Sequence, residues 1–103
     1  MSREINPAED WPFEEEADAE AITLDRIMAG EAPVLLAARD DDGWQFLDGE
    51  HVFEEDGVVV LLGEMLQFDP TLRGLAGLPV GWYAVRTAPG AEWRRAEGEP
   101  EAV

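Results

Sequence analysis

The chemistry open to this chain is that of carboxylates, because few other reactive side chains are present. Its 103 residues hold 24 Asp and Glu, seven Arg, one His, and no Lys or Cys. The hydroxyl groups have structural explanations: Ser2 adjoins the start of the sequence, and Thr23, Thr71 and Thr87 are expected at a helix cap, a first helical turn and a strand end. Paired carboxylates can act in general acid–base catalysis, but among 24 acids some pairs lie close together by chance. We therefore expect a protein without enzymatic activity and without catalytic residues.

Two short acidic segments are the candidate sites for a metal ion. The first, Asp40-Asp41-Asp42-Gly43, lacks the alternating acids, the sixth-position Gly and the twelfth-position Glu of an EF-hand loop. Asp-Gly between two strands is instead typical of a hairpin turn. The second segment, residues 48–56, places His51 among carboxylates, but one His cannot meet the established spacings of zinc sites. We expect no metal ion and no cofactor. A carboxylate-ligated metal enzyme is the weakest of the alternatives that remain open.

The formal net charge of −17 limits the partners of the protein. Contact with nucleic acid or with an anionic membrane requires a cationic surface, so we expect neither. A basic protein is the partner that this charge attracts, and electrostatic steering accelerates its association. The charge is uneven: residues 1–56 carry 18 acids and three arginines, whereas residues 57–96 carry three acids and four arginines. An acidic contact face explains this asymmetry. The alternative is a housekeeping domain in which the acids only solvate the fold in a salt-rich environment.

The two acidic segments are also the predicted partner-binding surface. Charge would steer the encounter, while an aromatic side chain, Phe53 or Trp44, would supply the buried anchor. A second possible contact patch consists of Trp93, Arg94 and Arg95, because Trp and Arg are favoured at interface hot spots. The favoured explanation of the same three residues is a Trp–Arg stack that covers a sheet edge. The first surface comprises Asp40, Asp41, Asp42, Asp48, Glu50, Phe53, Glu54, Glu55 and Asp56.

The elements that must position these residues form one predicted α+β domain over residues 21–96. We expect an antiparallel sheet of about five short strands with two or three short helices packed on it. Residues 1–20 are expected to form an acidic, loosely ordered arm, and residues 97–103 a frayed acidic tail. Trp11 and Phe13 are expected to anchor the arm on the domain, and a contact site is the alternative role for them. No apolar run reaches the length of a membrane span, and the acidic N-terminus lacks the apolar stretch of a signal peptide. The expected location is cytoplasmic.

Local patterns place the elements along the chain. Thr23 is expected to cap a short helix that ends at Gly30. Further helical turns are expected over residues 63–68 and after Asp69-Pro70, where an N-cap acid precedes proline. Strands are expected at five places, and the third, a continuous apolar run, is expected in the covered centre of the sheet. The five strands are residues 33–39, 44–47, 58–62, 82–87 and 92–95.

One ordered set of features spans most of the chain. Ile22-Thr23 leads into the short helix, and a strand follows over residues 34–38. Then come Asp42-Gly43-Trp44-Gln45-Phe46, Asp69-Pro70 and Leu78-Pro79-Val80-Gly81-Trp82. In this order, over residues 21–95, the chain resembles a group of small, mostly bacterial domains of unknown function that is associated with immunity proteins of polymorphic toxin systems. The resemblance implies a shared fold and an inhibitor of a cationic toxin, and it supplies no catalytic residues.

Overall fold

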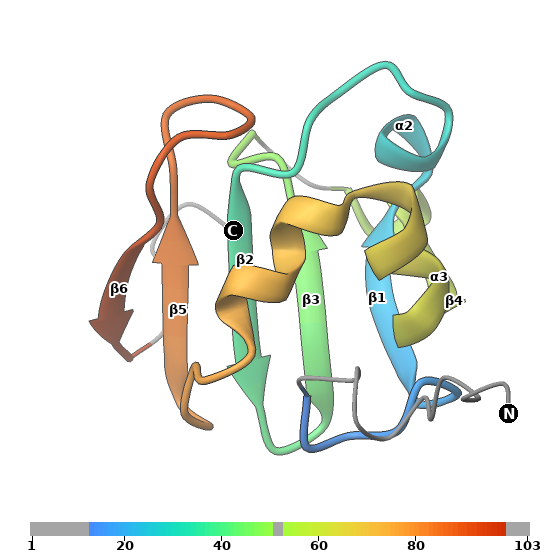
Figure 1. Ribbon diagram of the computed structural model, residues 1–103. Coiled ribbons are helices and arrows are strands. Elements are labelled where there is room, and N and C mark those ends of the chain that lie inside the picture. Colours follow the sequence, from blue (N-terminus) through green and yellow to red (C-terminus); the bar gives the residue numbers. More distant parts are fainter. Residues whose placement is uncertain (1–12, 51–52, 99–103) are drawn as a thin grey trace, which may run out of the picture.

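The computed structural model describes residues 13–50 and 53–98, and at Glu54 the backbone alone. Six strands of this part of the chain form one sheet (Figure 1): β1 (Glu20–Leu24), β2 (Leu36–Asp40), β3 (Gly43–Leu47), β4 (Gly57–Leu61), β5 (Trp82–Val85) and β6 (Arg94–Glu97). Their order across the sheet is β4-β1-β3-β2-β5-β6. β1 and β3 are parallel, and every other neighbouring pair is antiparallel.

Short helical elements connect the strands of the described chain. They are α2 (Asp25–Met28), the 3-10 helix η1 (Glu54–Asp56), α3 (Leu62–Phe68) and the 3-10 helix η2 (Pro70–Leu75). In Figure 1, α3 and η2 lie on the same face of the sheet. The predicted α+β class is therefore confirmed. The sheet differs in detail from the prediction, because it has six strands rather than about five and is mixed rather than antiparallel.

The hydrophobic core fills the space between the sheet and these helices. Trp44 and Phe46 of β3 stack with 5.7 Å between their ring centroids, and Met65 and Leu72 close the core from the helical side. Phe13 is also buried and packs edge-on against Trp44 at 5.1 Å. Burying a side chain of this size stabilises the fold by about 1.5–3 kcal/mol. Phe13 thus holds the segment before β1 against the domain, whereas Trp11 lies outside the described residues.

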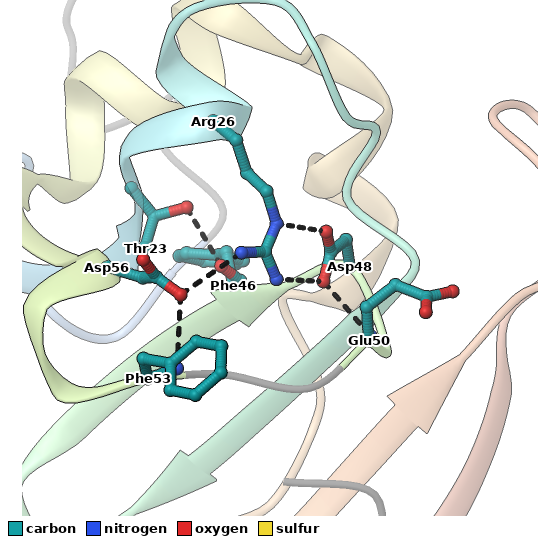
Figure 2. A network of polar contacts seen from close by, with 7 residues as sticks. All are labelled: Thr23, Arg26, Phe46, Asp48, Glu50, Phe53 and Asp56. Carbon is teal, nitrogen blue, oxygen red and sulfur yellow. Dashed lines mark hydrogen bonds and ion pairs between the residues drawn. The ribbon is translucent and has the colours of Figure 1, made fainter.

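Strand β1 corrects the prediction of a helix cap at Thr23. Thr23 lies inside the strand, and its hydroxyl donates a buried hydrogen bond of 2.8 Å to the carbonyl oxygen of Phe46 (Figure 2). Ala21 and Thr23 are buried while Ile22 between them is exposed, which is the two-residue period of a strand. α2 begins only after Leu24, and no side-chain hydrogen bond caps it. The cap prediction was wrong because a β-branched Thr fits a buried strand position as well as an N-cap.

Strand β4 corrects a second prediction, because it lies at the edge of the sheet and not in its covered centre. Within the described residues it pairs only with β1. The Val59 side chain is 59% exposed, and Ile22, its direct neighbour on β1, is 43% exposed. A continuous apolar run shows only that polar and apolar residue types do not alternate along the strand, whereas the burial of β4 does alternate. Such a run does not show which neighbours the strand has.

Candidate functional site

Arg26 of α2 closes the base of the acidic loop that follows β3 (Figure 2). Its Nε and Nη2 donate to the two carboxylate oxygens of Asp48 at 2.6 and 3.0 Å, and its Nη1 donates to Asp56 at 3.2 Å. Each carboxylate also accepts a backbone N–H at 3.0 Å, Asp48 from Glu50 and Asp56 from Phe53. Asp48 and Asp56 therefore hold the loop in shape. They are poor candidates for direct contact with a partner.

The ion pair keeps both groups charged. The hydrogen bonds from Arg26 lower the pKa of Asp48 below its ordinary value of 3.8, although burial acts in the opposite direction. The same hydrogen bonds raise the pKa of Arg26 above its ordinary value. A bidentate arginine–carboxylate pair fixes geometry as well as charge. Part of the loop's negative charge is thus neutralised within the fold.

Three described side chains of the loop that do not bind Arg26 face solvent. Glu50 and Glu55 are exposed, and Phe53 is 57% exposed. The side chain of Glu54 and all of His51 lie outside what the structure describes. Among the residues described, no group of three or more His, Asp or Glu is placed so that it could hold a metal ion.

The predicted turn at Asp40–Gly43 lies at the other end of β3 (Figure 1). Asp40 Oδ1 accepts the N–H groups of Asp42 and Gly43 at 2.9 and 3.1 Å, which shapes the turn. Gly43 has a φ of 126°, in the region that favours glycine. Asp41 and Asp42 are exposed. The length of β3 separates this turn from the 48–56 loop, so the structure does not bring the two acidic segments together as one surface.

The turn instead borders an acidic hollow of about 430 Å³. Ala19, Trp44 and Val80 provide its other walls. The indole Nε1 of Trp44 is buried and has no hydrogen-bond acceptor among the described residues. The hollow thus combines apolar walls with carboxylates from the turn and from the segment before β1. The acidic residues that line it are Glu15, Glu20, Asp40, Asp41 and Asp42.

Arg39 of β2 holds the segment before β1 beside the hollow. Its Nη2 donates to Glu14 at 2.7 Å, its Nε to Glu15 at 3.0 Å, and its Nη1 to the carbonyl oxygen of Leu78 at 2.7 Å. Burial lowers the pKa of Arg39, but the hydrogen bonds and charges of the two glutamates outweigh it and raise the pKa. The guanidinium lies 5.5 Å from the ring centroid of Trp44. The Arg39 guanidinium is therefore already paired with acceptors of the fold.

Sequence reasoning missed Glu15 and Glu20 as members of a site, because both fell within the predicted arm. One available signal was Phe13, a large apolar residue in a polar stretch, which is typical of an anchor point. Another was the β-branched pair Ile22-Thr23, since β-branched residues are enriched in strands. Together these signals would have placed the two glutamates against the domain.

The three residues of the second predicted patch do not form one stack. Arg86, rather than Arg94 or Arg95, covers the Trp93 ring, with its guanidinium carbon 4.4 Å from the ring centroid. Arg95 donates to the carbonyl oxygen of Gly74 at 2.6 Å and so links β6 to η2. Arg94 is exposed at the strand edge, and Trp93 is half-buried. The stack of Trp and Arg is present, but with a different arginine.

Comparison with known proteins supplies no relative from which a function can be transferred. The chain matches no protein-family model, and neither curated proteins nor solved structures gave a match. No helix of residues 13–50 and 53–98 is long and apolar enough to cross a membrane. Any function must therefore be argued from the side chains described above.

Proposed function

We propose that this protein is a non-enzymatic interaction protein that binds a basic protein, most concretely as an immunity-type inhibitor of a cationic toxin. The acidic hollow is the observation that carries the proposal. Arg39, which binds Glu15 of the hollow's lining, is buried and also binds Glu14. Glu20, Asp41 and Asp42 are exposed around the same hollow. The negative charge at this place is therefore directed at solvent.

The hollow suits a lysine or arginine side chain of the partner. Ala19 and Val80 offer apolar contact to its aliphatic stem, while the carboxylates receive its charged head. A concave surface lined by one sign of charge concentrates the electrostatic field and attracts the opposite charge. The hollow thus favours a partner side chain by its positive charge first and by its shape second.

The loop after β3 has a different role in this proposal. Its exposed acids, Glu50 and Glu55, lie at the far end of β3 from the hollow. They contribute to the long-range field that accelerates encounter, and this effect weakens over about 8–10 Å at physiological salt. Asp48 and Asp56 bind Arg26 and stabilise the fold, so they do not contact the partner in this proposal.

The experiment is capture of the partner followed by kinetics. Tagged protein is used to retain binding proteins from its source lysate at low and at moderate salt, and association rates of the recovered protein are then measured by surface plasmon resonance. We expect a basic protein, and an association rate that falls about tenfold in the double variant Asp41→Lys/Asp42→Lys. The matched control Glu92→Lys/Glu97→Lys makes the same charge change at the β6 side and should have a much smaller effect. If both variants behaved as wild type, the hollow would have no part in binding.

A further inference from the structure

The edge of β4 offers backbone hydrogen-bonding groups that the sheet does not use. The N–H of Leu62 donates to the carbonyl oxygen of Ala19 at 2.8 Å, which fixes the phase of the β1–β4 ladder. Because hydrogen-bonded pairs alternate along an antiparallel ladder, Val60 bonds to β1, whereas Gly57 and Val59 direct their N–H and C=O groups away from it. Within the described residues, no other strand pairs with this edge.

This edge has little of the protection that natural sheet edges carry. Edge strands are usually shielded by charged residues, by proline or by a covering segment. β4 contains neither a charged residue nor a proline over Gly57–Leu61. Among the contacts of the described residues, only one covers this edge: the N–H of Leu61 donates to the carboxylate of Glu64 at 3.0 Å. Gly57 and Val59 remain open to an added strand.

An apolar strip lies beside this edge, on the face of the sheet away from α3 and η2. Val59 pairs directly with Ile22 of β1, and the two side chains share this face. Leu61, two residues after Val59, lies on the same face and is 40% exposed. All three are large apolar side chains in contact with water. A strand added to β4 would place its own alternate side chains against them.

The charged residues around the apolar strip indicate which kind of segment could bind to it. Glu20 pairs with Leu61 and also lines the acidic hollow, so the strip and the hollow adjoin. Glu55 lies just before β4 in the sequence and Glu64 lies just after it, and both side chains are exposed. A second copy of this chain would bring the same carboxylates face to face across the new strand pair. A basic segment would instead complement them.

We propose that β4 accepts an extended strand from the basic partner, so that the sheet continues into that protein. Apolar side chains of the added strand cover Val59, Ile22 and Leu61, and lysines or arginines at its ends meet the flanking glutamates. Backbone hydrogen bonds supply affinity and alternate side chains supply specificity in this mode of recognition. This inference rests on the proposed function and adds to it the way in which the partner binds.

The test uses a synthetic peptide as the probe, KVTVTVTVK, which is extended, apolar on one face and basic at both ends. Its matched control, EVTVTVTVE, differs only in the end charges. On the protein, Val59→Pro removes one outward N–H and no hydrogen bond of the sheet, since proline is tolerated where an edge N–H faces solvent. Val59→Thr retains the N–H and the β-branched shape. Affinities are measured by fluorescence polarisation of the labelled peptides.

We expect KVTVTVTVK to bind wild type, and both EVTVTVTVE on wild type and KVTVTVTVK on Val59→Pro to bind about tenfold more weakly. The Val59→Thr variant should bind KVTVTVTVK about as well as wild type. Amide hydrogen exchange on wild type provides a readout that does not depend on the proline variant folding: the Val59 amide should exchange more slowly when KVTVTVTVK is bound.

Three results would overturn the proposal. One is no binding of KVTVTVTVK, the second is binding without protection of the Val59 amide, and the third is a wild-type dimer in sedimentation velocity that Val59→Pro abolishes. The last would assign the edge to a second copy. If a basic protein is captured from lysate but binds Val59→Pro as it binds wild type, only the strand-addition mode fails. If no basic protein is captured, the proposed function itself fails.

Discussion

At the scale of single residues, arginine side chains form hydrogen bonds that connect parts of the fold far apart in sequence. Arg86 is the most buried of them, and it joins three parts of the chain. Its Nε donates to the carbonyl oxygen of Val34 at 2.9 Å, its Nη1 to the hydroxyl of Thr71 at 2.8 Å, and its Nη2 to Asp69 at 3.0 Å. Asp69 also accepts the N–H of Thr71 at 3.0 Å, so one residue caps η2 and receives the guanidinium.

Replacing Arg86 by Met tests this network. The methionine keeps most of the apolar stem but leaves the Val34 carbonyl and the Asp69 carboxylate without the guanidinium. We expect a loss of about 3 kcal/mol in the free energy of unfolding, because breaking a buried charged pair leaves an uncompensated charge. The measurement is urea unfolding followed by tryptophan fluorescence. Arg94→Met, at an exposed position of β6, is the control and should change stability little. Similar losses for the two variants would contradict this assignment.

Asp48 gives the fold a pH dependence whose sign follows from its pKa. The pKa is lowered in the folded state, first by the hydrogen bonds from Arg26. The stabilisation is therefore fully present above the ordinary value of 3.8 and is lost as the pH falls through the folded-state value. Asp48→Asn should cost about 2 kcal/mol at pH 7 and should reduce the loss of stability on acidification below about pH 4. Urea midpoints from pH 7 to pH 3 measure this, with exposed Asp41→Asn as control. Parallel curves for wild type and Asp48→Asn would be evidence against the ion pair.

At the scale of elements, the sequence predicted those that local chemistry determines. The Asp-Gly hairpin, the helix before Phe68 and the turn after Asp69-Pro70 all agree with the structure, because each depends on neighbours in the chain. The parallel pairing of β1 with β3 and the edge position of β4 were not predictable. They depend on contacts between residues that are far apart in sequence, such as the hydrogen bond from Thr23 to Phe46.

The residues of the candidate site were likewise predicted only in part. The turn residues Asp41 and Asp42 were predicted as contact residues, and their exposure follows from the hairpin. The contribution of Glu15 and Glu20 to the hollow was missed, because it requires residues 13–19 to dock on the domain, and Phe13 was the local signal of that docking. That docking uses the N–H of Gly63, which donates to Ala17 at 2.8 Å. A Cβ at Gly63 would lie only 3.1 Å from the same carbonyl oxygen, so glycine permits the close approach.

The docking of residues 13–19 can be tested through Phe13. Phe13→Ala removes the edge-on contact with Trp44, and we expect a loss of about 2–3 kcal/mol, at the low end for such truncations because the segment can move away. Amide exchange of Leu62 and Gly63, which bond to Ala19 and Ala17, should then be faster. Phe68→Ala is the control, because Phe68 is exposed at the end of α3. Unchanged exchange at both amides in Phe13→Ala would mean that the segment is held without its aromatic anchor.

At the scale of the whole molecule, the order of the strands distributes the charge. β1, β3 and β2 belong to the acidic residues 1–56, and β4, which pairs with β1, lies in the sequence between the exposed Glu55 and Glu64. β5 and β6 lie in a later part of the chain that carries Arg86, Arg94 and Arg95. Between residues 13 and 68 of the described chain, Arg26 and Arg39 are the only cationic Lys or Arg positions, and both bind acids of the fold. On the β4 side of the molecule the exposed charged groups are therefore carboxylates. The β6 side exposes charged groups of both signs.

This distribution separates an acidic contact face from simple salt adaptation. If the acids only solvate the fold, neutralising any three exposed acids should relieve self-repulsion to a similar extent. If the carboxylates are crowded around the hollow, the triple variant Glu20→Gln/Asp41→Asn/Asp42→Asn should raise the Tm at low salt by about 4–8 °C, and more than the control Glu31→Gln/Glu50→Gln/Glu92→Gln. The difference should shrink in about 0.5 M NaCl, where the Debye length falls below about 5 Å. Differential scanning calorimetry at low and high salt measures both quantities. Equal gains in the two triple variants would favour salt adaptation and would leave the hollow without special electrostatic character.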